Sequence, residues 1–158
     1  MSVIISSPDT VGAIGGLLRA ADGVRRELTR VLEPHGLSGQ QYNVLRILRG
    51  AHPAALPTLS VAARLLEKTP GITRLLDKLE TKQLVARVRD ESDRRQVYCS
   101  VTAAGLELLT ALDNVVQNAN ARALEPLDSA ELTTLVGLLE KLSAPPLKAQ
   151  HPKRGASS

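Results

Sequence analysis

The spacing of apolar residues predicts three long helices, one at the start of the chain and two near its end. Apolar side chains recur every three or four positions from residue 9 to residue 32, and Pro34 ends the pattern. A second stripe follows Thr102 to about residue 124, and a third begins at Asp128 or Ser129. The pattern predicts that the apolar positions of the third helix are mostly buried: Leu132, Leu135, Val136, Leu138, Leu139 and Leu142.

Shorter helices are predicted between the long ones. Ser38 with Gln41 three residues later forms the sequence of a capping box, so a helix should begin here. The Gly- and Pro-rich stretch from residue 50 to residue 57 predicts a loop. Thr58 or Ser60 then suits the N-cap of a short third helix.

The next helix has a sharply predicted start. Thr69 is a favoured N-cap residue, and Pro70 suits the first helical position because its missing N–H and fixed φ cost little there. Its apolar positions recur at helical spacing and are Ile72, Leu75, Leu76 and Leu79. The opposite face is short, polar and mostly basic, and carries Gly71, Thr73, Arg74, Asp77, Lys78 and Lys82. Two short helices joined in this way fit a helix-turn-helix.

Two alternating runs after this helix predict a β-hairpin with one buried face. Residues 84 to 89 alternate along the first strand, and Val97, Cys99 and Val101 share one side of the second. The loop between them ends in Asp93, Arg94 and Arg95. A helix able to enter a major groove, followed by a hairpin with a basic tip, is the arrangement of a winged helix-turn-helix. An ordinary α+β domain with a charged hairpin remains the alternative.

The distribution of charge supports a surface that faces phosphate. The formal net charge is +4, but residues 58 to 101 carry nine Lys/Arg against six Asp/Glu, whereas residues 102 to 144 carry two against six. Residues 145 to 158 add three Lys/Arg and lack the apolar content of a core, which predicts a disordered basic tail. A modest basic excess is also common on solvated faces, so the sign alone does not identify a partner.

Composition excludes several other classes. Two tyrosines with neither Phe nor Trp argue against single-stranded nucleic acid, whose bases stack on aromatic side chains. One cysteine leaves no intramolecular disulfide, and no apolar run approaches a membrane span or a signal peptide, so we expect a cytoplasmic protein. The three histidines are scattered, and no glycine-rich phosphate loop or serine elbow occurs, so neither a metal site, a cofactor nor an enzyme is expected. Cys99 is expected to be a buried thiol, with a redox sensor as the alternative.

The three long helices carry more apolar surface than a small winged head needs. A helix that is apolar over most of its circumference usually meets a partner. We therefore expect residues 10–33 and 103–143 to form a helical dimerisation region with a second copy, and residues 38–101 to form the DNA-binding domain. A self-contained monomeric helical domain is the alternative.

The quoted motifs resemble the MarR family of bacterial regulators. The resemblance rests on LSGQQYNVLRIL and on TRLLDKLETKQLVARVRDESDRRQVYCSVTAAG, and spans roughly residues 10 to 143. It implies a mainly α-helical homodimer with a small β-hairpin wing, in which each protomer offers one winged head to a palindromic operator. It also implies a repressor released by a small phenolic or other amphipathic anion. A winged head that binds protein instead of specific DNA is the alternative.

The resemblance assigns roles to individual residues. Arg74 resembles the base-reading arginine of the recognition helix, Thr73 and Lys78 its neighbouring contacts, and Arg94 the arginine placed in the minor groove. Asp93 and Arg95 match a pair that usually braces the wing. The full set of expected DNA-contacting residues is Thr69, Pro70, Gly71, Thr73, Arg74, Lys78, Arg89, Asp93, Arg94 and Arg95. An effector pocket where the long helices meet the head would be faced by Arg19, His35, Arg46 or Arg49.

The sequence departs from the family pattern at one position that matters for backbone geometry. Gln83 stands where the family usually has a glycine after the recognition helix. A helix that ends in a left-handed residue prefers glycine there, so Gln83 predicts a strained C-cap.

Overall fold

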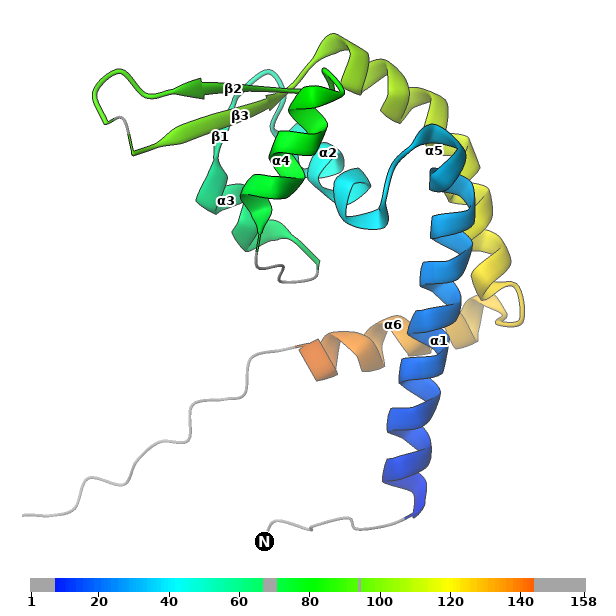
Figure 1. The fold of residues 1–158 in the computed structure, drawn as a ribbon. Helices are drawn as coiled ribbons and strands as arrows, with labels where there is room; N and C mark the ends of the chain where they lie inside the picture. Colours follow the sequence, from blue (N-terminus) through cyan, green and yellow to red (C-terminus); the bar gives the residue numbers. More distant parts are fainter. Residues whose placement is uncertain (1–7, 67–70, 94, 144–158) are drawn as a thin grey trace, which may run out of the picture. The chain divides into compact units, whose positions relative to one another are not determined.

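A computed structural model describes residues 8–66, 71–93 and 95–143 (Figure 1). The elements in chain order are α1 (Pro8–Leu32), the 3₁₀-helix η1 (Glu33–His35), α2 (Gly39–Ala51), β1 (Leu56–Pro57), α3 (Thr58–Arg64), α4 (Ile72–Thr81), β2 (Val85–Arg89), β3 (Val97–Val101), α5 (Ala103–Leu124) and α6 (Ser129–Ser143). The predicted positions Thr69, Pro70, Arg94 and 145–158 lie outside the described residues. The chain forms two compact units, one up to Ala123 and one from Leu124 that contains α6. The fold is mainly helical with a small sheet, as predicted.

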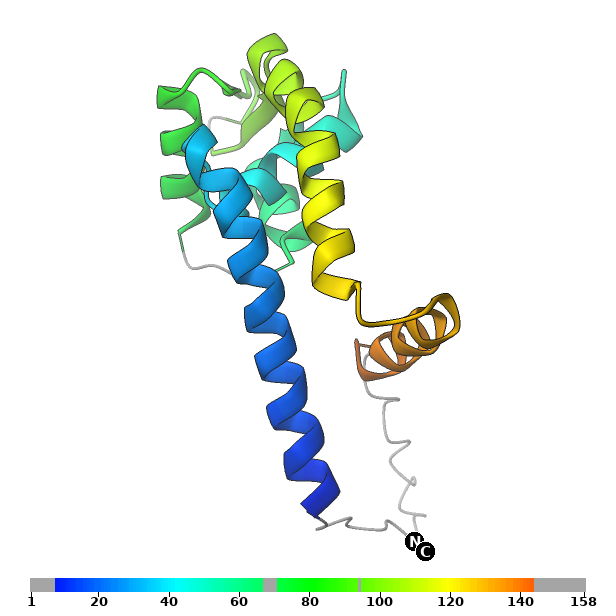
Figure 2. The same ribbon diagram turned by 90° about the vertical axis from the view of Figure 1, so that its right-hand side faces the viewer.

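Helix α1 follows the predicted stripe but buries only its C-terminal end within the chain. It runs without interruption from Pro8 to Leu32 (Figure 2), and only Val31 and Leu32 are buried. Further toward its start, large apolar side chains lie in solvent, with Val11 75% exposed. The folded single chain therefore leaves most of this apolar face without a neighbour.

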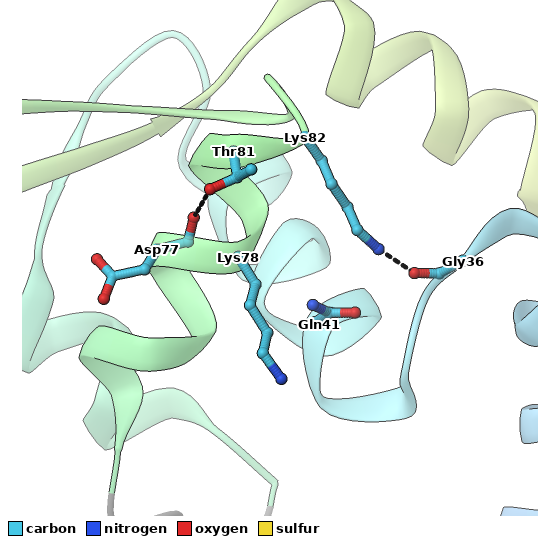
Figure 3. A pocket seen from close by; sticks show the side chains of 6 residues that line it. All are labelled: Gly36, Gln41, Asp77, Lys78, Thr81 and Lys82. Carbon is cyan, nitrogen blue, oxygen red and sulfur yellow. Dashed lines mark hydrogen bonds between the residues drawn. The ribbon is translucent and has the colours of Figure 1, made fainter.

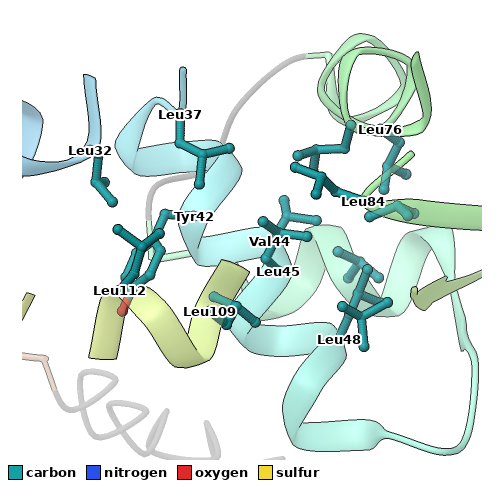
Figure 4. Close-up of a cluster of buried hydrophobic side chains, with 14 of the residues drawn as sticks. Leu32, Leu37, Tyr42, Val44, Leu45, Leu48, Leu76, Leu84, Leu109 and Leu112 are labelled. Carbon is teal, nitrogen blue, oxygen red and sulfur yellow. The ribbon is translucent and has the colours of Figure 1, made fainter. Parts of the chain in front are cut away.

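The core surrounds α2. The predicted capping box is present, because Gln41 N donates to Ser38 Oγ at 3.2 Å and Ser38 N donates to Gln41 Oε1 at 3.0 Å. Starting from this fixed end, α2 buries one apolar side among residues from α1, α4 and α5 (Figure 4). The fully buried large side chains of this cluster include Leu32, Leu45, Leu48, Leu76, Leu79, Leu109 and Leu112.

The sheet has three antiparallel strands in the order β1-β3-β2. Strand β1 lies in the stretch that was predicted to be a loop, and its two residues pair with Tyr98 and Cys99. In the hairpin, Val85 pairs with Val101 and Arg87 with Cys99, so these four share the face that is buried toward α4. The other face of β2 is open, and Val88 is 66% exposed. On β2, Val88 therefore faces solvent, and Arg87 faces the same side as the buried Cys99.

Thr58 does not cap α3, contrary to the prediction. Its Oγ1 donates to the carbonyl of Val97 at 3.0 Å, and Pro57 occupies the N-cap without a side-chain bond. The hydroxyl thus ties the start of α3 to β3 across the sheet. A local capping rule cannot register a partner 39 positions away in the chain.

The predicted start of α5 is confirmed and includes a close approach of two backbones. Gly105 N donates to Thr102 Oγ1 at 3.1 Å, so Thr102 is the cap. A Cβ added to Gly105 would lie 2.5 Å from the carbonyl oxygen of Leu84. The glycine is required because any side chain here would push α5 away from Leu84, directly before β2.

The expectation that the apolar positions of α6 are mostly buried is wrong for the single chain. None of its residues is buried, and Leu142 is 73% exposed. The helix itself is well defined, since Asp128 Oδ1 accepts from the amides of Ala130 and Glu131. The apolar side chains of α6 therefore stay at least partly exposed in the single chain.

The predicted strain after α4 is confirmed. Gln83 has φ +60°, and two bonds close the helix end as in a Schellman motif: Leu84 N to Leu79 O at 3.0 Å and Gln83 N to Glu80 O at 2.8 Å. The same motif ends η1, where Leu37 N donates to Leu32 O and a glycine, Gly36, takes φ +66°. Gly36 is the residue type that this left-handed conformation favours, whereas Gln83 is not.

We predict that Gln83→Gly raises the free energy of unfolding by about 0.5–1 kcal/mol, because glycine removes the Cβ clash of the left-handed conformation. Gln83 is exposed, and its recorded bonds use backbone atoms, so little side-chain contact is lost. Gln83→Ala is the control, since it shortens the side chain but keeps Cβ. Chemical denaturation of both variants would contradict the account if alanine stabilised as much as glycine.

Candidate DNA interface

The exposed face of α4 is the centre of the candidate interface. Leu75, Leu76 and Leu79 are buried, which turns Thr73, Arg74 and Lys78 into solvent on the other side. Gly71 is the N-cap at φ +124°, with open space where a Cβ would stand. The first turn of α4 therefore offers a polar surface with little side-chain bulk at its start.

The lysines of α4 differ in their surroundings. Lys78 and Lys82 both line an open hollow of about 470 Å³ between α4 and the start of α2 (Figure 3). Lys82 Nζ donates to the carbonyl oxygen of Gly36, so this lysine joins α4 to the end of η1. Lys78 extends from α4 on the same side as Lys82, and no bond to it is drawn in Figure 3. Lys78 is exposed, and it stays a predicted DNA contact.

Asp90 organises the tip of the wing, and the sequence prediction missed it. Its Oδ1 accepts from Ser92 N at 2.7 Å, Ser92 Oγ at 2.5 Å and Asp93 N at 3.0 Å. The hydroxyl of Ser92 is the largest cause that lowers the pKa of Asp90, followed by the two amides. An aspartate followed two residues later by serine is a turn signal that could have identified this role.

Asp93 and Arg95, the pair expected to brace the wing, are joined through the backbone of Arg95. Asp93 Oδ1 accepts from the backbone N of Arg95 at 3.0 Å. Gln96 N donates to Asp93 O at 2.8 Å, and Asp90 N donates to Gln96 O. The carboxylate thus fixes the backbone of the tip, and the side chain of Arg95 is exposed.

Arg87 and Arg89 lie on the same face of β2, on either side of Val88, but their surroundings differ. Arg89 is exposed at the end of the strand and lines a hollow of about 240 Å³ with Glu80, Arg87 and Val97. Arg87 is half-buried. Glu80 Oε2 accepts from its Nε at 2.9 Å and its Nη2 at 2.5 Å, and Asp77 Oδ1 accepts from Nη2 at 2.6 Å. The bond to Glu80 is the main cause that raises the pKa of Arg87. Arg89 therefore remains a candidate contact, whereas Arg87 joins the wing to α4.

The four predicted effector residues do not form one site. Arg49 is held by Asp113 of α5 through two bonds of 2.9 Å, and Arg46 lies 6.0 Å above the ring of Tyr42. Burial raises the pKa of Tyr42. Arg19 and His35 are exposed on α1 and η1, and neither of the two hollows above is lined by any of the four. The structure brings Arg46 and Arg49 together and leaves Arg19 and His35 separate.

Cys99 is fully buried, as the alternation of β3 predicted. Its Sγ lies 3.5 Å from Thr58 Oγ1, and burial raises the pKa of the thiol. Because the thiolate is the reactive form, a buried thiol with a raised pKa is poorly suited to sensing oxidants.

The described part of the chain contains neither a metal-binding group of side chains nor a membrane-spanning helix. Within it, no group of three or more His, Cys, Asp or Glu side chains is arranged to hold a metal ion. In the same residues, no helix has both the length and the apolar character needed to cross a membrane.

Comparison with known proteins points to one family of DNA-binding regulators. Residues 35–96 match the model of the MarR family. The HTH-type transcriptional repressor Mb2911 of Mycobacterium bovis is 33% identical over 131 residues, which cover 81% of this chain and 91% of the repressor. A MarR transcription factor from Planctomyces limnophilus is 39% identical, with a TM-score of 0.69 over 84% of this chain and 96% of that one. A mutant E. coli MarR in complex with operator DNA is 25% identical, with a TM-score of 0.75 over 86% and 97%.

An exposed polar helix beside a β-hairpin wing is the arrangement of a winged helix-turn-helix. The sequence and structural matches extend over most of the chain. The chain belongs to the MarR family, and it is a DNA-binding transcription regulator rather than an enzyme.

We predict that Asp90→Ala weakens duplex binding about fivefold, because three hydrogen bonds that shape the wing tip are lost. The thermal midpoint should hardly change, since the tip is exposed and far from the core. Glu91→Ala is the control: it removes a neighbouring negative charge and should strengthen binding slightly. Fluorescence anisotropy would disprove the role of Asp90 if both variants bound DNA more tightly than the wild type.

Proposed function

We propose that the protein is a homodimeric repressor that binds a palindromic operator through two winged heads and responds to a small anionic effector. The observation that carries this proposal is the polar face of α4, which is held outward by a buried apolar face directly beside the wing. In the proposed division, residues 38–101 bind DNA, and residues 10–33 and 103–143 form the dimer. Such a repressor would act in the cytoplasm, where its duplex DNA is.

The proposed contacts divide into base reading and backbone positioning. Arg74 would bond a guanine edge with its fork of donors, because this pairing suits the major groove. Thr73, Gly71 and Lys78 would approach the sugar-phosphate backbone, which fixes register without carrying sequence information. Arg94 at the wing would enter the adjacent minor groove, where a narrow A/T-rich groove attracts a guanidinium. Arg95, which is expected to brace the wing with Asp93, is also a proposed DNA contact.

The proposed dimer is supported by apolar surface that the single chain leaves open. The large apolar side chains exposed on the long helices are Val11, Ile14, Leu17, Leu18 and Val24 on α1, Val115 on α5, and Val136, Leu138, Leu139 and Leu142 on α6. Large apolar side chains left exposed in such numbers are typical of interaction surfaces. The acidic balance of residues 102 to 144 also suits a region that is kept away from DNA. A second copy would cover these faces by two-fold symmetry.

The proposed repressor activity and effector rest on relatives and on resemblance. The relative from Mycobacterium bovis is named a transcriptional repressor. A small phenolic or other amphipathic anion is the effector class that the resemblance implied. Arg46 and Arg49 beside Tyr42 are the predicted effector residues that lie together. A carboxylate or phenolate there would bond Arg46 and would compete with Asp113 for Arg49.

We predict that Arg74→Ala costs about 1–3 kcal/mol on an operator selected from random duplexes and relaxes the preference at one base pair in each half-site. Lys78→Ala should weaken operator and random duplex alike, because a phosphate contact is indifferent to sequence. Arg26→Ala on α1 removes the same charge from an exposed helix outside the winged head and serves as the control. Equal losses on both DNAs for Arg74→Ala would remove this residue from base reading.

We predict that Leu138→Asp with Leu142→Asp dissociates the homodimer, because burial of two unpaired carboxylates at an interface is strongly unfavourable. Both leucines are more than half exposed in the single chain, so the monomer should keep its helical content. Thr133→Asp with Thr134→Asp adds the same charge to α6 at exposed polar positions and is the control. Sedimentation velocity would disprove this interface if the leucine variant remained a folded dimer.

A further inference from the structure

We propose that Arg87 is a positioning residue for operator recognition, which holds α4 and the wing in the relation that lets both engage DNA at once. The proposal rests on the function proposed above and adds three residues that the sequence analysis did not assign to DNA binding: Arg87, Asp77 and Glu80. Arg87 need not touch DNA. Its role is to join the two elements that do.

The joint consists of one guanidinium and two carboxylates. Nε and Nη2 of Arg87 both donate to Glu80 Oε2, and Nη2 also donates to Asp77 Oδ1. The carboxylates lie one turn apart on α4, so the guanidinium of the strand spans the side of the helix. A planar fork that contacts two carboxylates restricts both the distance and the angle between the elements.

The position of the joint explains why the wing needs it. Val85 is buried at the base of β2, but Ala86, Val88 and Arg89 are exposed, so apolar packing ends close to the core. Arg87 is the residue beyond Val85 on this strand that is partly enclosed. On the far side of the hairpin, Thr58 holds the carbonyl of Val97. The outer part of the hairpin extends past α3 and α4 in Figure 1, and its recorded polar tie to α4 is Arg87.

The joint also reduces the negative charge on the face of α4 that is proposed to meet DNA. Asp77 lies between Arg74 and Lys78 in the sequence, and an unpaired carboxylate there would repel phosphate. Arg87 neutralises part of this negative charge from within the protein. Electrostatics alone and the joint therefore predict opposite results for Glu80→Gln. Loss of a negative charge should tighten binding, whereas loss of the joint should weaken operator binding.

The test compares Glu80→Gln with Glu27→Gln. Glu27 accepts from Arg30 and lies 3.6 Å from Arg122, so it joins α1 to α5 outside the winged head. The two side chains are similarly exposed, at 42% for Glu80 and 36% for Glu27. Both substitutions remove one negative charge and disrupt an ion cluster between two elements. Glu80→Gln affects the cluster between α4 and β2, whereas Glu27→Gln affects the one between α1 and α5.

We expect Glu80→Gln to weaken operator binding about threefold to tenfold and to leave random-duplex binding unchanged or slightly tighter. Glu27→Gln should leave the ratio of the two affinities unchanged. Arg87→Met should lose more of this ratio than Glu80→Gln, and Arg87→Lys should fall between Arg87→Met and the wild type, because one ammonium lacks the fork. Thermal unfolding of each variant is measured alongside, and we expect similar midpoints because partly exposed ion pairs contribute little to stability.

A double-mutant cycle separates positioning from general stability. If Arg87 holds the wing in place, Arg95→Ala should cost less operator affinity in the Arg87→Met background than in the wild type. Additive losses would overturn the proposal, as would a tighter operator complex for Glu80→Gln or equal losses for Glu80→Gln and Glu27→Gln. If the wild type does not prefer operator over random duplex, the proposed function is disproved. If the wild type prefers the operator and Glu80→Gln prefers it equally, this inference alone is disproved.

Discussion

The burial of one face of α4 against α2 determines how the rest of the winged head is used. Leu76 and Leu79 are fully buried with Leu45 and Leu48 of α2, and each large apolar side chain buried in this way contributes roughly 1.5–3 kcal/mol. This packing fixes the rotation of α4 about its own axis. The outward direction of Arg74 and Lys78 therefore follows from leucines that never meet DNA.

Polar ties carry this fixed orientation into parts of the head that the apolar core does not reach. Lys82 joins the end of α4 to Gly36, Thr58 holds β3, and Arg87 connects β2 to α4. Single ties of this kind between exposed or half-exposed groups contribute little to global stability. They are directional, however, so their effect is to select one geometry among several of similar free energy. In this head, the apolar core provides stability and the polar ties provide alignment.

The parts of the fold that could be predicted from sequence are those set by neighbouring residues. The capping box at Ser38, the cap at Thr102 and the left-handed Gln83 all depend on partners within a few positions, and all are present. Strand β1, the bond from Thr58 to Val97 and the Arg87 cluster depend on chain segments brought together by folding. Periodicity cannot register them. For the same reason, the alternation along β2 did not reveal that its arginines lie on the inner face.

Acidic residues help to shape the candidate DNA interface, so the net charge of this region describes it poorly. Asp90 shapes the tip of the wing through backbone amides, and Asp77 with Glu80 holds the guanidinium of Arg87. Each carboxylate opposes DNA electrostatically but limits the conformations of a cationic element. The carboxylate strengthens DNA binding only if the free energy gained by the aligned cation at a phosphate or base exceeds the cost of repulsion between the carboxylate and DNA. Alignment prevails where the cation must meet one base edge, because a flexible arginine would lose conformational entropy on every contact.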